Sequence, residues 1–593
     1  MDFQPKTEPA SSSTTHESFN EMSISELVSD LRANCDKVEE VFFSRDAKHK
    51  AEIGSLAVKY ELERLQRLHI EGELKKRQQE YLNLERKWSE LEKENKKNMD
   101  TIQKLKDENR RLEKEKCNAD AEKHLNEMAA VPDSSLSKKR KKGVGHCIGK
   151  SSDINRLNEK WHIAGALDFE RPRLLNPRRS GHTMAPPEVL LPFLREAGFG
   201  DAMQLKDFVF DNTLISAFIE RWRPETHTFH LPWGECTITL QDVAYHLGLR
   251  TDGEPVGGCM RDFQTWHQHP TWQWIEELLG AMPPTQSQGR NEGFAIKLAW
   301  LRERVQHIPI GASDDTLRQY ARCYILMLIG GYLMTDKSSS LVHIRWLPLL
   351  ADFNRCRQLS WGAAVLAWTY HSLCSATHRN VTDIAGCIPL LMSWIYHRFP
   401  KLGPSDRDVA TFPLAVRLIG LGQQSRDRRE VRMLRWRYKL DTMGLDQFRW
   451  TPYDVPELQA LSPDWLRSVH EIHTWRAVVP LVCFNFVEFH HVDRVKKQLG
   501  LDQEIPKDPV NVDKYLSKTA RGDDVWWPKV LCEWYDKWRA RHQPDYMITI
   551  TPKPDPQPTQ EYFSWWLEHC RVRFLSVDNM LDDPRLRELP ENV

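Results

Sequence analysis

Alternating apolar and polar residues mark the stretch 226–258, which reads T-H-T-F-H-L-P-W-G-E-C-T-I-T-L-Q-D-V-A-Y-H-L-G-L-R-T-D-G-E-P-V-G-G. Phe229 and Leu231 alternate with polar neighbours, and so do Cys236 and Ile238, which is the period of a β-strand. The intervening P-W-G is typical of a turn. The stretch therefore opens with a predicted β-hairpin, which buries little by itself and needs helices to cover it.

A helix is predicted directly after the hairpin. Thr239 can cap its free backbone N–H groups, and Asp242 three residues later completes an acidic capping box. The residues that share its apolar face are Leu240, Val243, Ala244 and Leu247. Gly248 is expected to end the helix, because glycine readily adopts the left-handed backbone at a helix C-terminus.

Helical spacing of apolar residues recurs through most of the chain downstream of residue 171. The other predicted helices comprise residues 187–197, 205–222, 294–306, 315–334, 342–350, 362–375, 388–398, 465–470, 479–499, 526–541 and 561–575. Strands do not alternate with crossover helices, so a doubly wound parallel sheet is not expected. The predicted fold class is mainly α, with an N-terminal coiled coil and a large helical domain that contains a minor β-hairpin.

An a/d heptad seam runs along the N-terminal part of the chain, with Lys and Glu on its flanks. The seam residues are Tyr81, Leu84, Trp88, Leu91, Asn95, Asn98, Ile102, Leu105, Asn109 and Leu112. An asparagine at an a position hydrogen-bonds its twin across a two-stranded interface, so Asn95 and Asn109 favour a parallel homodimer. The alternative is a single charged helix that dimerises weakly, because the same heptad register places charged residues at a and d positions further upstream.

A basic run follows the heptads in a linker with Ser and Gly on its flanks. It consists of Lys138, Lys139, Arg140, Lys141 and Lys142. An extended K-K-R-K segment suits the groove of a nuclear import receptor, which predicts a nuclear protein. A solvated charge run and a weak nucleic-acid tether are the alternatives. The predicted division of the chain is a disordered N-terminus (1–24), a helical coiled-coil region (25–130), a basic disordered linker (131–170), a helical domain (171–580) and a tail (581–593).

The composition indicates in which compartment the protein acts and which kinds of partner it binds. The formal net charge is zero, so any attraction for nucleic acid or a membrane must be local. The 12 cysteines include no C-x-x-C pair, which indicates reduced thiols in the cytosol or nucleus. The N-terminus lacks the apolar core of a signal peptide, and the apolar run 324–334 is too short to span a bilayer. An intracellular protein without a membrane partner is expected.

Several motifs resemble those of the plant mobile domain family. Beside the stretch 226–258 they are L-L-N-P-R-R-S-G-H (174–182), Y-I-L-M-L-I-G-G-Y-L-M-T-D-K-S (324–338), L-P-L-L-A-D-F (347–353), L-S-W-G-A-A-V-L-A-W-T-Y (359–370), R-W-T-P-Y (449–453) and P-L-V-C-F-N-F-V-E-F-H (480–490). This family is similar to transposon-encoded proteins and to domesticated nuclear proteins of the Maintenance of Meristems type. The resemblance covers residues 171 to about 574 and implies transposon silencing, genome stability or meristem and developmental maintenance.

The sequence predicts no enzyme and no cofactor. The phosphate loop G-x-x-x-x-G-K-[ST] does not occur in it. The family is also catalogued as aminotransferase-like, and Lys337 is the candidate for a pyridoxal phosphate lysine, but it fits a loop lysine better. Some family members resemble fusions to a metallophosphatase, whose motifs D-x-H and G-N-H-E are absent from this sequence.

No metal site is predicted either. The closest group of metal-ligand residue types is His371, Cys374, His378 and Cys387, whose spacing H-x2-C-x3-H-x8-C fits no standard zinc module. His371 and Cys374 lie one turn apart on an apolar helix, which favours core packing.

Two segments are candidates for nucleic-acid contact. Residues 239–249 resemble the first helix and turn of a helix-turn-helix, but Gly and Pro break the second helix that would enter the major groove. In residues 425–440, arginines that could neutralise phosphates interleave with aromatic rings that could stack on bases. The candidate contacts are Arg428, Arg429, Arg432, Arg435, Trp436 and Arg437. The alternative is a helix whose arginines pair with acidic residues and whose tryptophan lies in the core.

The predicted function is that of a non-enzymatic nuclear protein. A coiled coil pairs two chains, the basic linker binds the import receptor, and the helical domain engages chromatin or protein partners. The alternative is a transposase-related DNA- or RNA-binding protein, or an enzyme whose site is formed by residues far apart in the sequence.

Overall fold

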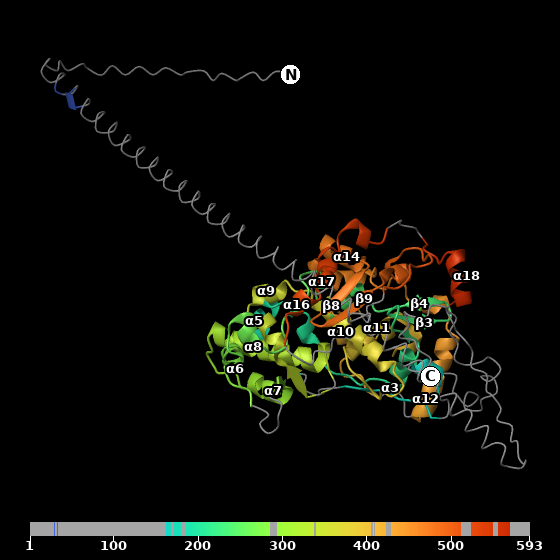
Figure 1. The fold of residues 1–593 in the computed structure, drawn as a ribbon, viewed down its shortest axis with the longest axis horizontal. Helices are drawn as coiled ribbons and strands as arrows, with labels where there is room; N and C mark the ends of the chain where they lie inside the picture. Colours follow the sequence, from blue (N-terminus) through green and yellow to red (C-terminus); the bar gives the residue numbers. More distant parts are fainter. Residues whose placement is uncertain are drawn as a thin grey trace, which may run out of the picture. The chain divides into compact units, whose positions relative to one another are not determined.

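The computed structural model describes residues 29, 32–33, 162–167, 171–178, 184–284, 293–336, 338, 340–404, 407, 410–422, 428–510, 524–549 and 555–569. The chain divides into two compact units, Met1–Lys142 and Gly143–Val593. The heptad seam, the basic run 138–142, Lys337 and both predicted terminal segments lie outside the described residues, so these expectations stay predictions. The architecture below is that of the second unit (Figure 1).

Helices dominate the described part of this unit, which confirms the mainly α fold class. The α-helices are α2 (Leu191–Glu196), α3 (Asn212–Ile219), α4 (Leu240–Leu247), α5 (Phe263–His267), α6 (Thr271–Leu279), α7 (Leu298–Gln306), α8 (Asp314–Leu328), α9 (Phe353–Arg357), α10 (Trp361–Ala376), α11 (Ile388–Arg398), α12 (Arg429–Asp441), α13 (Pro456–Leu461), α14 (Val469–Trp475), α16 (Trp527–Val530), α17 (Cys532–Arg539) and α18 (Gln560–His569). The predicted helix 388–398 is confirmed at both ends. The predicted helix 205–222 begins only after Asp211, whose carboxylate caps the N–H groups of Thr213 and Leu214.

The predicted hairpin and its helix are confirmed, with one additional strand. Strands β2 (Trp222–Arg223), β3 (Thr228–Leu231) and β4 (Gly234–Cys236) form an antiparallel sheet in which Phe229 lies opposite Cys236. Thr239 and Asp242 form the capping box at the start of α4, and Gly248 ends that helix with φ of 65°. Both signals act over a few residues, so the local sequence suffices to specify them.

The predicted helix 479–499 is wrong over most of its length. Residues in this segment form the hairpin β8 (Val479–Cys483) and β9 (Phe486–His490), followed by the 3₁₀ segment η11 (Val492–Leu499). Phe484 makes the tight turn with φ of 52°. Both faces of this hairpin are buried, so the polar and apolar alternation that reveals a half-buried strand is missing.

Helix α10 occupies the centre of the apolar core, and it packs against α4, β8 and β9 (Figure 1). Almost all of its residues are buried, which explains why its sequence has little polar periodicity. Two further small sheets join distant segments: β1 (Asn176–Pro177) pairs with β7 (Asp383–Ile384), and β5 (Ala295–Lys297) with β6 (Leu341–His343). In the described ranges, no helix is long and apolar enough to cross a bilayer.

Candidate functional site

Helix α12 carries the basic segment that the sequence singled out, and its side chains divide into two groups. Arg435 and Arg437 are buried, and Arg437 donates to both carboxylate oxygens of Glu220, with distances of 3.0 Å from Nε and 2.7 Å from Nη2. Trp436 is half-buried, and its Nε1 donates to Asp211 Oδ2 at 3.2 Å. Arg437 and Trp436 therefore attach α12 to the two ends of α3, as the alternative interpretation of this segment expects.

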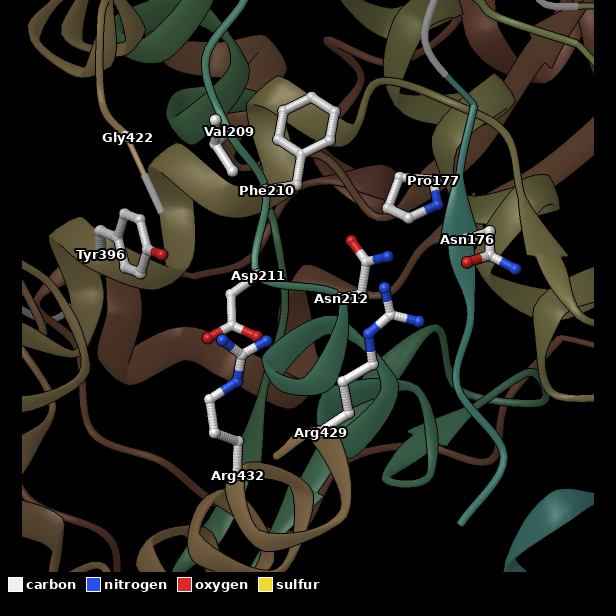
Figure 2. Close-up of a pocket in the computed structure, with 10 residues that line it drawn as sticks. All are labelled: Asn176, Pro177, Val209, Phe210, Asp211, Asn212, Tyr396, Gly422, Arg429 and Arg432. Atoms are coloured by element: carbon white, nitrogen blue, oxygen red, sulfur yellow. The ribbon is translucent and has the colours of Figure 1, made fainter. Parts of the chain in front are cut away.

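The remaining arginines of the candidate set lie towards the surface. Arg428 and Arg429 are exposed, and Arg432 is half-buried. Arg429 and Arg432 line a cavity of about 350 Å³, towards which Figure 2 shows both guanidinium groups directed. The structure thus narrows the candidate contacts to the N-terminal turn of α12, and it leaves nucleic-acid binding by them a prediction.

The cavity is built from five separate parts of the chain. Its other lining residues are Asn176, Pro177, Val209, Phe210, Asp211, Asn212, Tyr396 and Gly422. The carboxylate of Asp211 has a structural role, because it caps α3 and accepts a hydrogen bond from Trp436. Burial raises the pKa of the Tyr396 hydroxyl, with a further contribution from Asp211 and an opposing one from Arg432, so this group is a neutral donor.

This lining suits an anion with several oxygens. Two guanidinium groups provide charge and paired N–H donors, and Asn212 and Tyr396 add neutral donors at the same cavity. Arginine recognises phosphate and carboxylate groups through parallel hydrogen bonds, which a lysine cannot reproduce. The sequence indicated the arginines of this site, but Asn212 on α3 and Tyr396 on α11 reach the same cavity only through the tertiary fold.

A second polar group lies beneath the capping box of α4. The Ser393 hydroxyl is 2.7 Å from His246 Nδ1, His246 Nε2 is 3.1 Å from the Tyr453 hydroxyl, and that hydroxyl donates to Asp242. Arg398 donates to the same Asp242 carboxylate from Nε and Nη2. All five side chains are fully or almost fully buried, and burial holds the pKa of His246 well below its usual value. We interpret this group as a structural network that ties α4 to α11.

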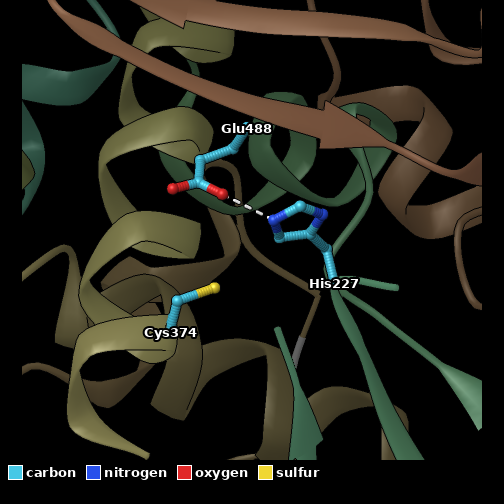
Figure 3. A group of neighbouring side chains, drawn as sticks. All are labelled: His227, Cys374 and Glu488. Carbon is cyan, nitrogen blue, oxygen red and sulfur yellow. Dashed lines mark hydrogen bonds and ion pairs between the residues drawn. The ribbon is translucent and has the colours of Figure 1, made fainter. Parts of the chain in front are cut away.

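A third group brings together side chains of metal-ligating type. His227, Cys374 and Glu488 are buried, and one donor atom of each lies within 4.8 Å of the others (Figure 3). His371 extends the group, because its Nδ1 is 3.0 Å from Glu488 Oε1. The sequence had paired His371 with Cys374, but it missed His227 and Glu488. A glutamate within the apolar run 480–490 was the available signal for a buried charge.

The other two residues of the sequence-based group belong elsewhere. His378 forms a short antiparallel bridge with His162, and Cys387 precedes α11 as its N-cap residue. Residues 239–249 form α4 with its terminal glycine, and the chain after it continues without a helix until α5. This order lacks the second helix that a helix-turn-helix needs directly after its turn.

Comparison with known proteins places this architecture in a family. The plant mobile domain model matches residues 198–567, and the chain belongs to the plant mobile domain family. Among relatives from Arabidopsis thaliana, Protein MAINTENANCE OF MERISTEMS is 32% identical over 348 residues, which are 57% of this chain and 68% of the relative. Protein MAIN-LIKE 1 is 34% identical over 330 residues, or 56% of this chain and 61% of the relative.

A further relative carries the name of an enzyme. The Serine/threonine-protein phosphatase 7 long form homolog of Arabidopsis thaliana is 34% identical over 403 residues, which are 65% of this chain and 29% of that relative. The chain thus spans less than two thirds of the length of several curated relatives that it matches. No solved structure gives a significant match.

Proposed function

We propose that this plant mobile domain protein is a non-enzymatic nuclear protein that binds DNA within chromatin. Its role would lie in transposon silencing, genome stability or meristem and developmental maintenance. Membership of the family and similarity to Protein MAINTENANCE OF MERISTEMS support the biological setting. The proposed mode of action rests on one observation, the cavity beside the N-terminal turn of α12.

Arg429 and Arg432 give this cavity the chemistry of a phosphate site. They come from successive turns of one helix face, since they are three residues apart, and both line the cavity. Their helix is held in place by the buried pair of Arg437 and Glu220, so the backbone that carries the two arginines is fixed before an anion binds. Because the chain has zero formal net charge, attraction for a polyanion must come from local basic groups, and these two arginines form one of them.

The predicted coiled coil would place two such cavities in one dimer. A second contact on the same DNA then forms as an intramolecular step, which raises the apparent affinity without any new contact. Sedimentation of the full chain tests this step. A monomer at micromolar concentration would contradict the paired arrangement, whereas a dimer that is lost when Leu91 and Leu105 are replaced by Lys would support it.

Binding of labelled duplex DNA to the full chain tests the proposal. The double variant Arg429→Gln/Arg432→Gln should weaken binding at least tenfold, because each lost charge-assisted contact contributes about 1.5–3 kcal/mol. Arg539→Gln is the matched control, since Arg539 is a half-exposed arginine on a different helix, α17. Equal affinities of the double variant and the parent chain for duplex DNA would contradict the proposal. Tighter binding of single-stranded RNA than of duplex DNA would identify RNA, and not DNA, as the ligand.

The relative named as a phosphatase favours one alternative, an enzyme. The match covers 29% of that relative, and this sequence contains neither D-x-H nor G-N-H-E. We therefore expect no hydrolysis of a phosphorylated serine peptide by the full chain in the presence of Mn²⁺. Turnover that is abolished by a chelator would favour the enzyme over the binding protein.

A further inference from the structure

Three distant segments converge at the group of His227, Cys374 and Glu488. His227 lies in the turn between β2 and β3, Cys374 lies on α10, and Glu488 lies on β9 (Figure 3). His371 is one turn before Cys374 on α10, and its ring approaches the same carboxylate. We propose that these four side chains bind a structural zinc ion, which joins the 222–236 sheet, α10 and the β8–β9 hairpin.

The donor set is the first argument. Three side chains place an imidazole nitrogen, a thiol sulfur and a carboxylate oxygen within 4.8 Å of one another, and His371 adds a second imidazole through its contact with Glu488. These are ligand types that zinc accepts in tetrahedral sites. His371 and Cys374 have the i, i+3 spacing that places both on one face of a helix, so a single ion can reach both. The other two ligands come from β-structure packed on that face, and α10 contacts both β2 and β9.

The electrostatics of Glu488 are the second argument. Its side chain is fully buried, and both carboxylate oxygens face imidazoles, with Oε2 2.5 Å from His227 Nε2 and Oε1 3.0 Å from His371 Nδ1. A carboxylate loses much of its hydration when it is buried, so a buried carboxylate is stable only with polar or charged partners. A divalent cation compensates the charge of Glu488 and of the Cys374 thiolate together.

The backbone at His227 is the third argument. Its φ of 53° lies in the left-handed region, which is unfavourable for a residue with a side chain. Two contacts hold it there: its N–H donates to Arg223 O at 2.8 Å, and its carbonyl accepts from Thr237 Oγ1 at 2.6 Å. The ring stacks on Tyr370 with an interplanar angle of 4°. A ligand held in this way is oriented before the ion binds.

Zinc binding requires a small adjustment of the His227–Glu488 contact and a rotation of the His371 ring towards the other three ligands. Zn–N and Zn–O bonds of about 2.0 Å separate tetrahedral ligand atoms by about 3.3 Å. His227 Nε2 and Glu488 Oε2 must therefore move apart by less than an ångström from their hydrogen-bonded distance. An ion can enter past His371, whose side chain is 35% exposed while that of Glu488 is fully buried.

Metal analysis of the full chain tests the proposal. The chain is purified without a metal-affinity column, stripped of metal with a chelator and then reconstituted with zinc. Elemental mass spectrometry should then find one zinc ion per chain. Reconstitution with Co²⁺ should give a thiolate-to-metal charge-transfer band, which reports the Cys374 contact directly and does not require a variant. Absence of both signals from the parent chain, or a stoichiometric metal other than zinc, would overturn the proposal.

Variants assign the ion to these residues. Cys374→Ser should abolish the cobalt band, and Glu488→Gln should lower zinc affinity at least tenfold, as expected for a lost ligand. Cys387→Ser is the matched control, because Cys387 is an equally buried cysteine outside the group. Circular dichroism verifies that each variant is folded. Zinc retained equally by Cys374→Ser and the parent chain would identify binding to other residues and contradict the site. DNA binding plays no part in these measurements, so this proposal and the proposed function fail separately.

Discussion

Arg437 on α12 and Glu220 at the end of α3 form a two-point ion pair that is almost completely buried, with Nη2–Oε1 at 2.7 Å and Nε–Oε2 at 3.0 Å. Arg221, which follows Glu220 in the chain, forms a second ion pair in the opposite direction. Its Nη2 lies 2.5 Å from Oδ1 of Asp441 at the end of α12. The two pairs cross between the same two helices. They fix the orientation of α12 and with it the positions of Arg429 and Arg432 at the cavity.

Glu220→Gln should destabilise the protein strongly. Removal of one partner leaves Arg437 buried without its counter-charge, which costs about 3–5 kcal/mol. Urea unfolding followed by tryptophan fluorescence measures this loss. Glu533→Gln is the control, because the Glu533–Lys537 pair is largely exposed and its loss should cost less than about 1 kcal/mol. Equal unfolding midpoints of the two variants would contradict a structural role for the buried pair.

Acid should weaken the fold partly through His490. Its Nδ1 lies 2.9 Å from Ala477 O, and its Nε2 lies 3.4 Å from the N–H of Leu240, an arrangement that needs a neutral ring. Burial lowers the pKa of His490 from 6.5 to about 4, against smaller opposing effects of Ala477 and Asp242. The unfolded chain therefore binds a proton first as pH falls below 6.5, and stability contributed by the neutral ring is lost between pH 6.5 and 4.

The size of this effect is on the order of 1.4 kcal/mol per pH unit for one histidine. His490→Gln should reduce the slope of unfolding free energy against pH in this window by about that amount, although the variant will be less stable at neutral pH. Urea midpoints at several pH values measure the slope. His307→Gln is the control because His307 is exposed. Parallel slopes for the parent chain and His490→Gln would show that this ring does not carry the acid sensitivity.

Gly248→Ala should separate steric overlap from backbone strain. Gly248 has φ of 65°, and an added Cβ would overlap Asp201 Cβ and lie 2.9 Å from Pro413 Cγ. Gly311 has a similar φ of 73°, but an added Cβ there meets no atom within 4 Å. Gly311→Ala should therefore cost only the conformational penalty of about 1–2 kcal/mol, and Gly248→Ala roughly 3 kcal/mol or more. Equal losses in thermal unfolding would contradict close packing at the end of α4.

Local signals allowed the sequence to predict part of this fold. The capping box of Thr239 and Asp242 and the glycine at 248 depend on neighbours within a few residues, and all three are where the sequence places them. The β8–β9 hairpin was missed because both of its faces are buried, which removes the two-residue period.

The candidate sites depend on contacts between distant segments. Arg437 and Arg429 look alike in the sequence, and only the approach of Glu220 decides that one is buried in an ion pair while the other remains exposed. The same holds for the proposed zinc site. Its two ligands on α10 follow from helical spacing, but Glu488 is 114 residues after Cys374 in the chain and joins it through the packing of β9 on α10.

The salt dependence of DNA binding by the full chain tests the central claim most directly. Each phosphate neutralised by an arginine contributes about 0.9 to the slope of log Kd against log salt concentration. The account predicts that Arg429→Gln/Arg432→Gln lowers this slope by about 2 per bound chain, whereas Arg539→Gln leaves it unchanged. A parent chain that binds no DNA, or a slope that is the same in the double variant, would contradict the assignment of the α12 cavity as a phosphate site.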